Sequence, residues 1–300
     1  MRKLLYKILP DAWVPYILHT RPRAWFIVSA HMSVGFLLAN GLNFGDGQIK
    51  QWLLAILAWG ILGNGGTLAI NSAYDLDEGD IGYLENPPPV PSHLNRFALI
   101  LLLIGTPVAA YLGFRFLLAY LVCALMSLMY SIPPFLFKSR AGFDVLINSI
   151  GFGGLTIYAG WAATGRLLEA PIINVVLAFV FFFVGFYPLT QIYQMAEDAA
   201  RGDYTLARAL NKRNSLILAI ITTLIGFFFL FSEIGARYLQ LRSLGIIIAL
   251  ACWMLVLIPW LIKHAEVDEK YEQKGFYKAL YAWAATDVAV AIAMVPFILA

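Results

Sequence analysis

Charged side chains are scarce in this chain of 300 residues. Asp, Glu, Lys and Arg make up 13% of it, whereas hydrophobic residues make up 61%. A soluble domain has roughly 25% charged residues, so too few are present here to cover a water-soluble globule of this length. The 21 basic and 18 acidic residues nearly balance, which gives no indication of nucleic-acid binding. The composition therefore predicts a protein dissolved in a lipid bilayer.

Cysteine is also rare, with two in the whole chain. Cys123 and Cys252 both lie inside apolar runs. A disulfide framework or a cysteine-based metal site is therefore not indicated. We expect two buried free thiols that pack as small hydrophobic residues.

Long apolar runs dominate what is present. A helix needs about 20 mostly apolar residues to cross the hydrocarbon core of a bilayer. Nine stretches qualify, at 24–44, 51–74, 97–114, 116–137, 145–165, 170–196, 214–232, 243–262 and 279–299. They predict an all-α, polytopic membrane protein with nine transmembrane helices, folded as a single domain over 1–300.

The first 20 residues differ from these runs. Lys7, Pro10 and Asp11 interrupt any apolar core, so the segment does not resemble a signal peptide. Trp13 and Tyr16, together with several basic residues, suit the headgroup region of a membrane. We expect residues 1–20 to form an interfacial segment.

The distribution of Lys and Arg predicts the orientation of the spans. With the N-terminus inside, the basic residues in outer loops are only Lys50, Arg115, Arg166, Arg237 and Arg242. All other Lys and Arg fall in inner segments, as the positive-inside rule requires. The sequence thus predicts an integral membrane protein with a cytoplasmic N-terminus and the C-terminus outside.

Two inner loops contain the same polar element. Residues 71–80 read N-S-A-Y-D-L-D-E-G-D, and residues 194–203 read Q-M-A-E-D-A-A-R-G-D. Both therefore follow the pattern amide, x, Ala, x, Asp, x, x, x, Gly, Asp, and upstream Thr67 aligns with Thr190. Four predicted spans separate the copies, so both lie on the cytoplasmic face and can form two facing half-sites.

Helical spacing extends each element into the membrane. Asn71 and Asp75 are four residues apart and share a helix face, which Asn64 and Thr67 continue. The second copy forms the same kind of stripe with Tyr187, Gln191, Gln194 and Asp198. Polar groups at membrane depth normally face a cavity or each other. We expect the helices to surround a central cavity, polar and apolar in part, that opens to the cytoplasm.

Carboxylate and amide oxygens suit hard divalent cations, above all Mg²⁺, which is often held by one or two carboxylates plus substrate phosphates. The segment from Asp75 to Glu85 has five acidic residues, and no basic residue follows before Arg96. A bound cation would reverse this field. The alternative is a solvated acidic loop. Basic residues on the same predicted face are Lys138, Arg140 and Arg201. Their positive charge suits phosphate binding. The alternative is that they only reflect the excess of Lys and Arg in the inner loops of a membrane protein.

These motifs, taken together, resemble the UbiA superfamily of intramembrane prenyltransferases. The matching elements are Asn71-x-x-x-Asp75, the segment from Asp198 through Asp203 to Ala207, and the loop Tyr130-Ser131-Ile132-Pro133-Pro134-Phe135-Leu136-Phe137-Lys138. Arg21-Pro22-Arg23-Ala24-Trp25 is similar to the opening of the family. The resemblance covers nearly the whole chain.

The resemblance implies transfer of an isoprenyl group from a prenyl diphosphate to a lipophilic acceptor, with Mg²⁺ as cofactor. It assigns the catalytic and metal-binding roles to Asn71, Asp75 and Asp198, with Asp77 and Asp203 as supporting metal ligands. Diphosphate contacts fall to Lys138, and also to Arg23 and Arg201. The cavity residues expected to contact substrate are Asn64, Tyr130, Tyr187, Gln191 and Gln194.

Several positions depart from the family pattern, which usually begins Asn-Asp-x-x-Asp-x-x-x-Asp. Ser72 and Gly79 replace two aspartates of the first motif, and Gln194 replaces the first aspartate of the second. These departures leave two alternatives open: a transporter or cation-binding membrane protein with two half-sites, and a family member that binds lipid without catalysis.

Four further polar residues lie within or beside the predicted spans. An ionised Asp287 would cost about 2.5–3.5 kcal/mol at the bilayer centre, so we expect it to face the bundle. Asp144 and Asn148, four residues apart, predict either a favourable helix start or a wall of the cavity. His31 is interpreted as a packed histidine.

Overall fold

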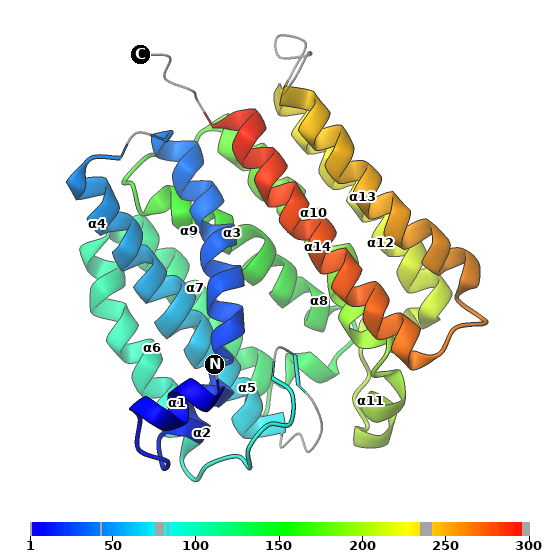
Figure 1. Cartoon of the computed structure of the whole chain (residues 1–300), viewed down its shortest axis with the longest axis horizontal. Helices are drawn as coiled ribbons and strands as arrows, with labels where there is room; N and C mark the ends of the chain where they lie inside the picture. Colours follow the sequence, from blue (N-terminus) through cyan, green and yellow to red (C-terminus); the bar gives the residue numbers. More distant parts are fainter. Residues whose placement is uncertain (1, 43, 76–80, 83, 235–241, 296–300) are drawn as a thin grey trace.

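The computed structural model describes residues 2–42, 44–75, 81–82, 84–234 and 242–295, and helices account for most of them (Figure 1). The helices, in chain order, are α1 (Arg2–Ile8), α2 (Val14–His19), α3 (Pro22–Asn40), α4 (Asp46–Ala55), η1 (Ile56–Gly63), α5 (Asn64–Asp75), α6 (Leu94–Tyr111), α7 (Phe114–Ser131), η2 (Phe137–Ser139), α8 (Phe143–Asn148), η3 (Ser149–Leu155), α9 (Thr156–Ala162), α10 (Ala170–Ile192), α11 (Met195–Arg201), α12 (Leu206–Ile234), α13 (Arg242–Lys263) and α14 (Glu269–Met294). Within these described ranges the only extended pairings are two isolated bridges. The predicted all-α fold is confirmed.

In the part of the chain that the structure describes, seven helical segments are long and apolar enough to cross a membrane. They are Asp46–Asp75, Leu94–Tyr111, Phe114–Ser131, Phe143–Ala162, Ala170–Ile192, Leu206–Glu233 and Ser243–Lys263. The predicted spans 24–44 and 279–299 correspond to α3 and α14, which are of similar length but carry His31 and Asp287 in their middle. These polar side chains lower the mean hydropathy, so seven spans rather than nine meet the criterion.

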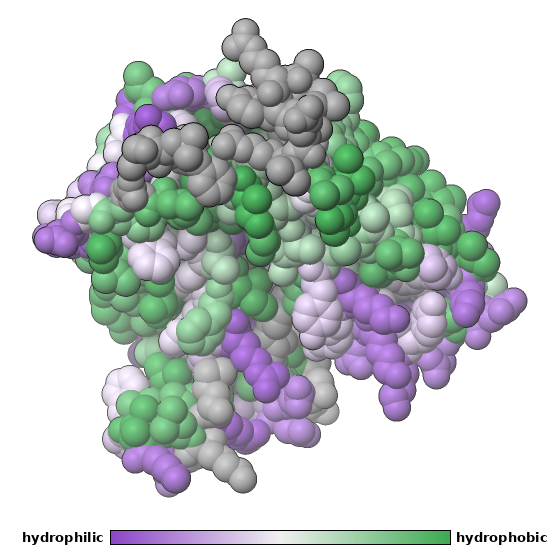
Figure 2. All heavy atoms as spheres, turned by 45° about the horizontal axis from the view of Figure 1, so that its top comes forward, coloured by the Kyte–Doolittle hydropathy of each residue, from purple (hydrophilic) through white to green (hydrophobic). Residues whose placement is uncertain are grey.

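The outer surface of the bundle is strongly apolar. Side chains such as Leu103, Phe114, Leu255 and Ile262 are more than two-thirds exposed. Figure 2 shows hydrophobic residues spread over the middle of the bundle, with hydrophilic residues towards its lower side and along its left and upper-left edge. Such a surface suits hydrocarbon rather than water.

The two largest of the four buried clusters among the described residues form most of the interior. The larger joins α3, α10, α12, α13 and α14 around Phe179, Phe182 and Trp253. The smaller joins α3, η1, α6, α7 and α9 around Phe36, Trp59 and Phe116. Because α3 contributes to both clusters, it lies between the two halves of the bundle.

Two π-helical segments interrupt the long helices, η1 in the second predicted span and η3 in the fifth. Trp59 of η1 reaches the first residue after η3, because its indole N–H donates to the hydroxyl of Thr156, at the start of α9, over 3.2 Å. Near them α3 crosses α9 so closely that a Cβ at Gly160 would overlap the Met32 carbonyl. The wide turns of π-helical segments such as η1 and η3 are frequent at functional sites.

The two polar elements lie at one end of the bundle. Figure 1 shows the C-terminal end of α5 and the short helix α11 at the lower end, together with α1 and α2. The start of α4, the start of α13 and the end of α14 lie at the opposite end. The four intervening helical spans, Leu94–Tyr111, Phe114–Ser131, Phe143–Ala162 and Ala170–Ile192, thus return the chain to the same side. Helices α1 and α2 lie in the predicted interfacial segment and pack on the chain before α6: the Arg2 guanidinium donates to the Asn86 carbonyl over 2.9 Å, and the Tyr16 hydroxyl donates to the Ser92 carbonyl over 2.5 Å.

Candidate functional site

A cavity of about 690 Å³ runs from this lower end into the middle of the bundle. Its lining comes from α3, η1, α5, α7, α8, η3, α10, α11 and α14. Both copies of the polar element contribute to it. The expected juxtaposition of the two elements is therefore present in the fold.

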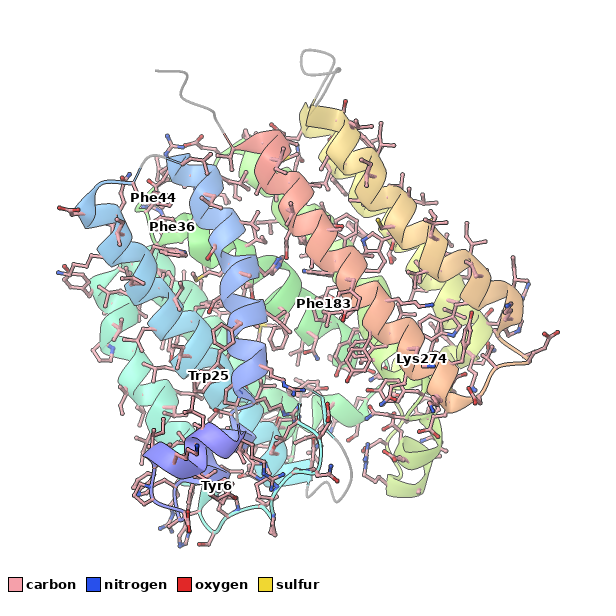
Figure 3. All side chains as sticks on the ribbon, in the orientation of Figure 1. Tyr6, Trp25, Phe36, Phe44, Phe183 and Lys274 are labelled. Atoms are coloured by element: carbon pink, nitrogen blue, oxygen red, sulfur yellow. The ribbon has the colours of Figure 1, made fainter. Side chains whose placement is uncertain are left out.

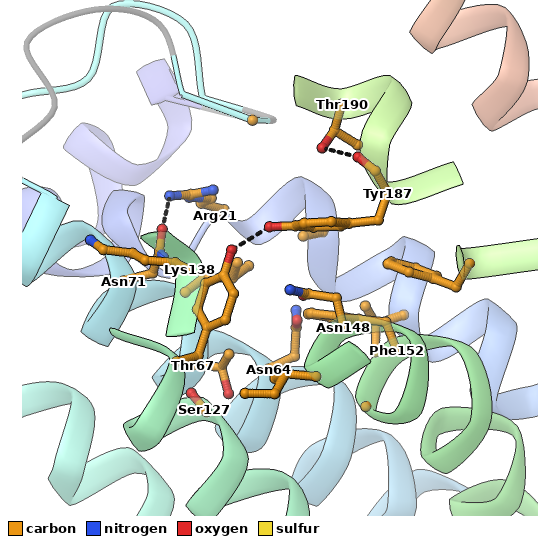
Figure 4. Close-up of a pocket in the computed structure, with 18 of the residues that line it drawn as sticks. Arg21, Asn64, Thr67, Asn71, Ser127, Lys138, Asn148, Phe152, Tyr187 and Thr190 are labelled. Carbon is orange, nitrogen blue, oxygen red and sulfur yellow. Dashed lines mark hydrogen bonds between the residues drawn. The ribbon is translucent and has the colours of Figure 1, made fainter. Parts of the chain in front are cut away.

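The first element lies at the end of α5. Asn71 accepts a hydrogen bond from the Arg21 guanidinium over 3.3 Å, and the same nitrogen reaches the Ser72 hydroxyl over 3.3 Å (Figure 4). Asp75, one turn further on, pairs with Lys138. Arg21 has a left-handed backbone with φ of 51° and begins α3 just before Pro22. This strained corner turns its side chain into the cavity.

The second element forms α11 and the turn after it. Asp198 is buried and accepts a hydrogen bond from Arg201 Nη2 over 2.6 Å, while Arg201 Nε donates to Asp203 over 3.1 Å. Burial raises the pKa of the Asp198 carboxyl to about 6, and the neighbouring Arg201 opposes that rise. Gly202 closes α11 with a φ of 79°, which brings Asp203 back beside Arg201.

A loop after α7 connects the two elements. The Tyr204 amide donates to the Ser139 carbonyl over 3.1 Å, which fixes the η2 turn against the second element. Lys138, on this turn, contacts Asp75 of the first element. Burial lowers the pKa of Lys138 to about 8, while Asp203 raises it. Lys138 therefore interacts electrostatically with both half-sites.

Asp144 connects three segments of the chain next to this site through hydrogen bonds to its carboxylate. Its side chain is 0% exposed, and its carboxylate accepts hydrogen bonds from the Gly142 amide over 2.8 Å, the Leu206 amide over 2.8 Å and the Gln191 amide group over 3.0 Å. It thus joins the start of α8 to α10 and to the start of α12. Its neighbour Asn148 lines the cavity. Of the two interpretations of this pair, the cavity wall fits Asn148, and the helix start fits Asp144, which lies in the first turn of α8.

The predicted cavity residues come together further inside. The hydroxyls of Tyr130 and Tyr187 form a hydrogen bond across the cavity, and Asn64 lies beside Asn148 in the same space (Figure 4). Gln191 and Gln194 line the same wall as Tyr187. All five predicted residues of this group line one cavity.

One of the predicted site residues, Arg23, is placed differently. The Arg23 side chain is 59% exposed and pairs with Glu85 over 3.2 Å, and it is not among the residues that line the cavity. Arg21, two positions earlier, occupies the place expected for Arg23. Asp77 lies outside the described residues.

The oxygen donors at the mouth suit Mg²⁺ in chemical type, because Asn71, Asp75, Asp198 and Asp203 offer only carboxylate and amide oxygens. Within the ranges that the structure describes, no three His, Cys, Asp or Glu side chains converge as a metal-binding group. Instead, each aspartate contacts a cation, either Lys138 or Arg201. The donor set therefore fits the metal in chemical type. Lys138 and Arg201 balance the negative charge of these aspartates.

Comparison with known proteins identifies the family. The sequence profile of the UbiA prenyltransferase family matches residues 28–285. The chain belongs to the UbiA prenyltransferase family. No curated protein shows significant sequence similarity to it.

Solved structures of UbiA homologues share the fold. A structure described as digeranylgeranylglyceryl phosphate synthase in membranes has a TM-score of 0.70 at 16% identity, covering 95% of this chain and 99% of that one. A UbiA homologue from Archaeoglobus fulgidus bound to GPP and Mg²⁺ has a TM-score of 0.70 at 18% identity, covering 92% and 99%. The same homologue bound to DMAPP and Mg²⁺ has a TM-score of 0.69 at 18% identity, covering 91% and 99%.

Proposed function

We propose that this protein is an intramembrane prenyltransferase that moves an isoprenyl group from a prenyl diphosphate to a lipophilic acceptor. The observation that carries the proposal is the convergence of two carboxylate elements and three cations, Arg21, Lys138 and Arg201, at the mouth of one cavity with an apolar interior. A diphosphate needs the charged mouth, and a prenyl chain needs the interior. The UbiA homologues that bind DMAPP or GPP with Mg²⁺ support this assignment.

Asn71, Asp75, Asp198 and Asp203 would hold Mg²⁺, with Asp77 as a further ligand on the family pattern. When bound, the cation supplies Lewis-acid neutralisation of charge on the departing diphosphate. Lys138 and Arg201, which pair with these aspartates in the free chain, can turn to the diphosphate oxygens. Arg21 holds Asn71 in position and adds a third positive charge.

The cavity residues would act on the prenyl group and the acceptor. Tyr130 and Tyr187 present aromatic faces just inside the mouth, where they can stabilise positive charge that develops on the allylic carbon. The closely packed helices exclude bulk water, which would otherwise capture that carbon. We further propose that all nine long helices span the bilayer and that the charged mouth faces the cytoplasm.

The function is tested with purified protein in lipid nanodiscs, geranyl diphosphate and Mg²⁺. We expect Mg²⁺-dependent binding of the diphosphate, lost with EDTA and reduced at least tenfold by Asp75→Asn or Asp198→Asn. Asp46→Asn, an exposed carboxylate at the start of α4, is the matched control and should bind as the wild type does. Release of diphosphate in the presence of an acceptor pool extracted from membranes would show turnover.

The three functions leave different marks in this assay. Binding that persists with no diphosphate release under any acceptor would favour a lipid-binding member without catalysis. Movement of an ion across liposomes with no chemical change would favour a transporter. Absence of any Mg²⁺-dependent diphosphate binding would refute the prenyltransferase proposal.

A further inference from the structure

The cavity divides into a charged mouth and an interior without formal charge. The Asp, Glu, Lys and Arg side chains in its described lining all belong to the mouth, and they are Arg21, Asp75, Lys138, Glu197, Asp198, Arg201 and Asp203. The interior nevertheless has polar side chains, among them His31 and Asn64. A simple prenyl tunnel would need none of them.

His31 lies at the inner end of two facing stripes. On α3 the lining residues Ala24, Val28 and His31 follow helical spacing, and on α14 Leu280 and Trp283 do the same. Ten residues of helix separate His31 from Arg21, which corresponds to about 15 Å along the axis. His31 therefore lies well inside the bundle, beyond the charged mouth.

Asp287, one turn past Trp283, fixes the orientation of His31. Its carboxylate lies 2.7 Å from His31 Nδ1, and the two side chains are 14% and 5% exposed. Phe179 and Trp283 contact the edges or face of the imidazole at centroid distances of 4.7 and 5.1 Å. With Nδ1 engaged by the Asp287 carboxylate, Nε2 is the ring nitrogen left for another partner. The expectation that Asp287 faces the bundle is confirmed.

Nε2 of His31 is buried and has no hydrogen-bond partner among the described residues. Asn64, on α5, is buried in the same cavity, and neither its amide nitrogen nor its oxygen finds a partner in that part of the chain. The hydroxyl of Ser127, another residue of the cavity lining, likewise has no hydrogen-bond partner in that part of the chain. Buried polar groups are normally satisfied, by protein or by something bound. Their concentration around one cavity points to a ligand with hydrogen-bonding atoms of its own.

We infer that His31, held by Asp287, and Asn64 form an inner subsite for the uncharged, hydroxyl-bearing head of the lipophilic acceptor. A hydroxyl both donates and accepts, so it can satisfy His31 Nε2 or either atom of the Asn64 amide, both of which lack a partner among the described residues. A carboxylate or phosphate head is excluded, because the interior offers no Lys or Arg among its described lining residues and Asp287 adds negative charge. The acceptor identity in this inference rests on the proposed function; the hydroxyl preference does not.

Three matched probes test the subsite: 4-octylphenol, 4-octylanisole and 4-octylbenzoate. They share the ring and tail and differ only in a free hydroxyl, a methylated hydroxyl or a carboxylate. Binding to the protein in nanodiscs is corrected for partitioning into empty nanodiscs. We expect the wild type to bind the phenol about tenfold more tightly than the anisole, which is about 1.4 kcal/mol, and the benzoate most weakly.

The ratio of phenol to anisole affinity is the readout for the variants. His31→Phe and Asn64→Leu should each bring the ratio close to one, and Asp287→Asn, which alters a positioning residue, should lower it in part. Phe183→Leu changes the apolar lining near the centre of the bundle (Figure 3) and should leave the ratio unchanged. If His31→Phe fails to fold because Asp287 is left alone, the double variant His31→Phe/Asp287→Leu removes both groups.

Geranyl diphosphate and Mg²⁺ binding is measured on the same samples. A phenol preference that His31→Phe abolishes, with donor binding intact, supports the subsite. Equal affinities for phenol and anisole in the wild type, or a preference that survives both His31→Phe and Asn64→Leu, overturn it and leave water as the partner of these groups. Loss of donor binding with the phenol preference retained overturns the proposed function and not the subsite.

Discussion

Asp144 gives the sharpest prediction about what holds the site together. It is fully buried, and its two carboxylate oxygens accept three hydrogen bonds from three different segments. Asp144→Ala leaves all three donors without this partner. Asp144→Asn leaves at least one unpaired, because an amide nitrogen must then face a donor.

The magnitudes follow from burial of the three donors. An unsatisfied buried donor costs about 1–3 kcal/mol. The bond from Gln191 is buried, whereas those from Gly142 and Leu206 are only partly buried, so water recovers part of their cost. We expect a loss of unfolding free energy of about 2–4 kcal/mol for Asp144→Ala and about 1–2 kcal/mol for Asp144→Asn.

The assay is unfolding in mixed detergent micelles, followed by circular dichroism, with Mg²⁺ affinity measured on the folded protein. Asp268→Ala is the control, since Asp268 caps α14 at the surface by accepting from the Tyr271 amide over 2.8 Å. Loss of such a cap costs about 1 kcal/mol and should not change Mg²⁺ affinity. If Asp144→Ala is no more destabilising than Asp268→Ala and leaves Mg²⁺ affinity unchanged, Asp144 does not position the second element.

Three further outcomes are expected. Arg21→Gln should weaken geranyl diphosphate binding at least tenfold while Arg23→Gln changes it less than twofold, since only Arg21 lines the cavity; equal effects would contradict the placement. Mg²⁺ affinity should fall about tenfold between pH 7 and pH 5, because the pKa of Asp198, about 6, makes it protonated and unable to bind metal at the lower pH, and calorimetry should show a flatter profile in Asp198→Asn. Gly160→Ala should lower the thermal unfolding temperature by several degrees, because its Cβ would overlap backbone atoms, whereas Gly47→Ala meets open space and should not; similar melting curves would argue against tight packing of α3 on α9.

The sequence by itself determined the class of protein and the main features of the fold. Scarce charge and repeated apolar runs are sufficient to predict membrane helices. Whether a segment forms such a helix depends on its own length and apolar composition, and not on which other segments it packs against. The presence of Asn71 and Asp75 in one cavity with residues of the 194–203 element was also predictable, since the number of intervening spans fixes the side on which each element emerges. Helical spacing alone was sufficient to place Asn71 and Asp75 on one helix face, and Tyr187 and Gln191 on another.

Only the tertiary structure decided which individual groups meet. Arg21 and Arg23 lie on either side of Pro22, and the sequence does not indicate which of them enters the cavity. The left-handed backbone of Arg21 directs its side chain into the cavity, whereas Arg23 lies outside it. His31 and Asp287 lie at opposite ends of the chain, and no local pattern joins them. Their contact arises because α3 and α14 pack side by side, and the cost of an unpaired charge in a membrane makes that contact necessary.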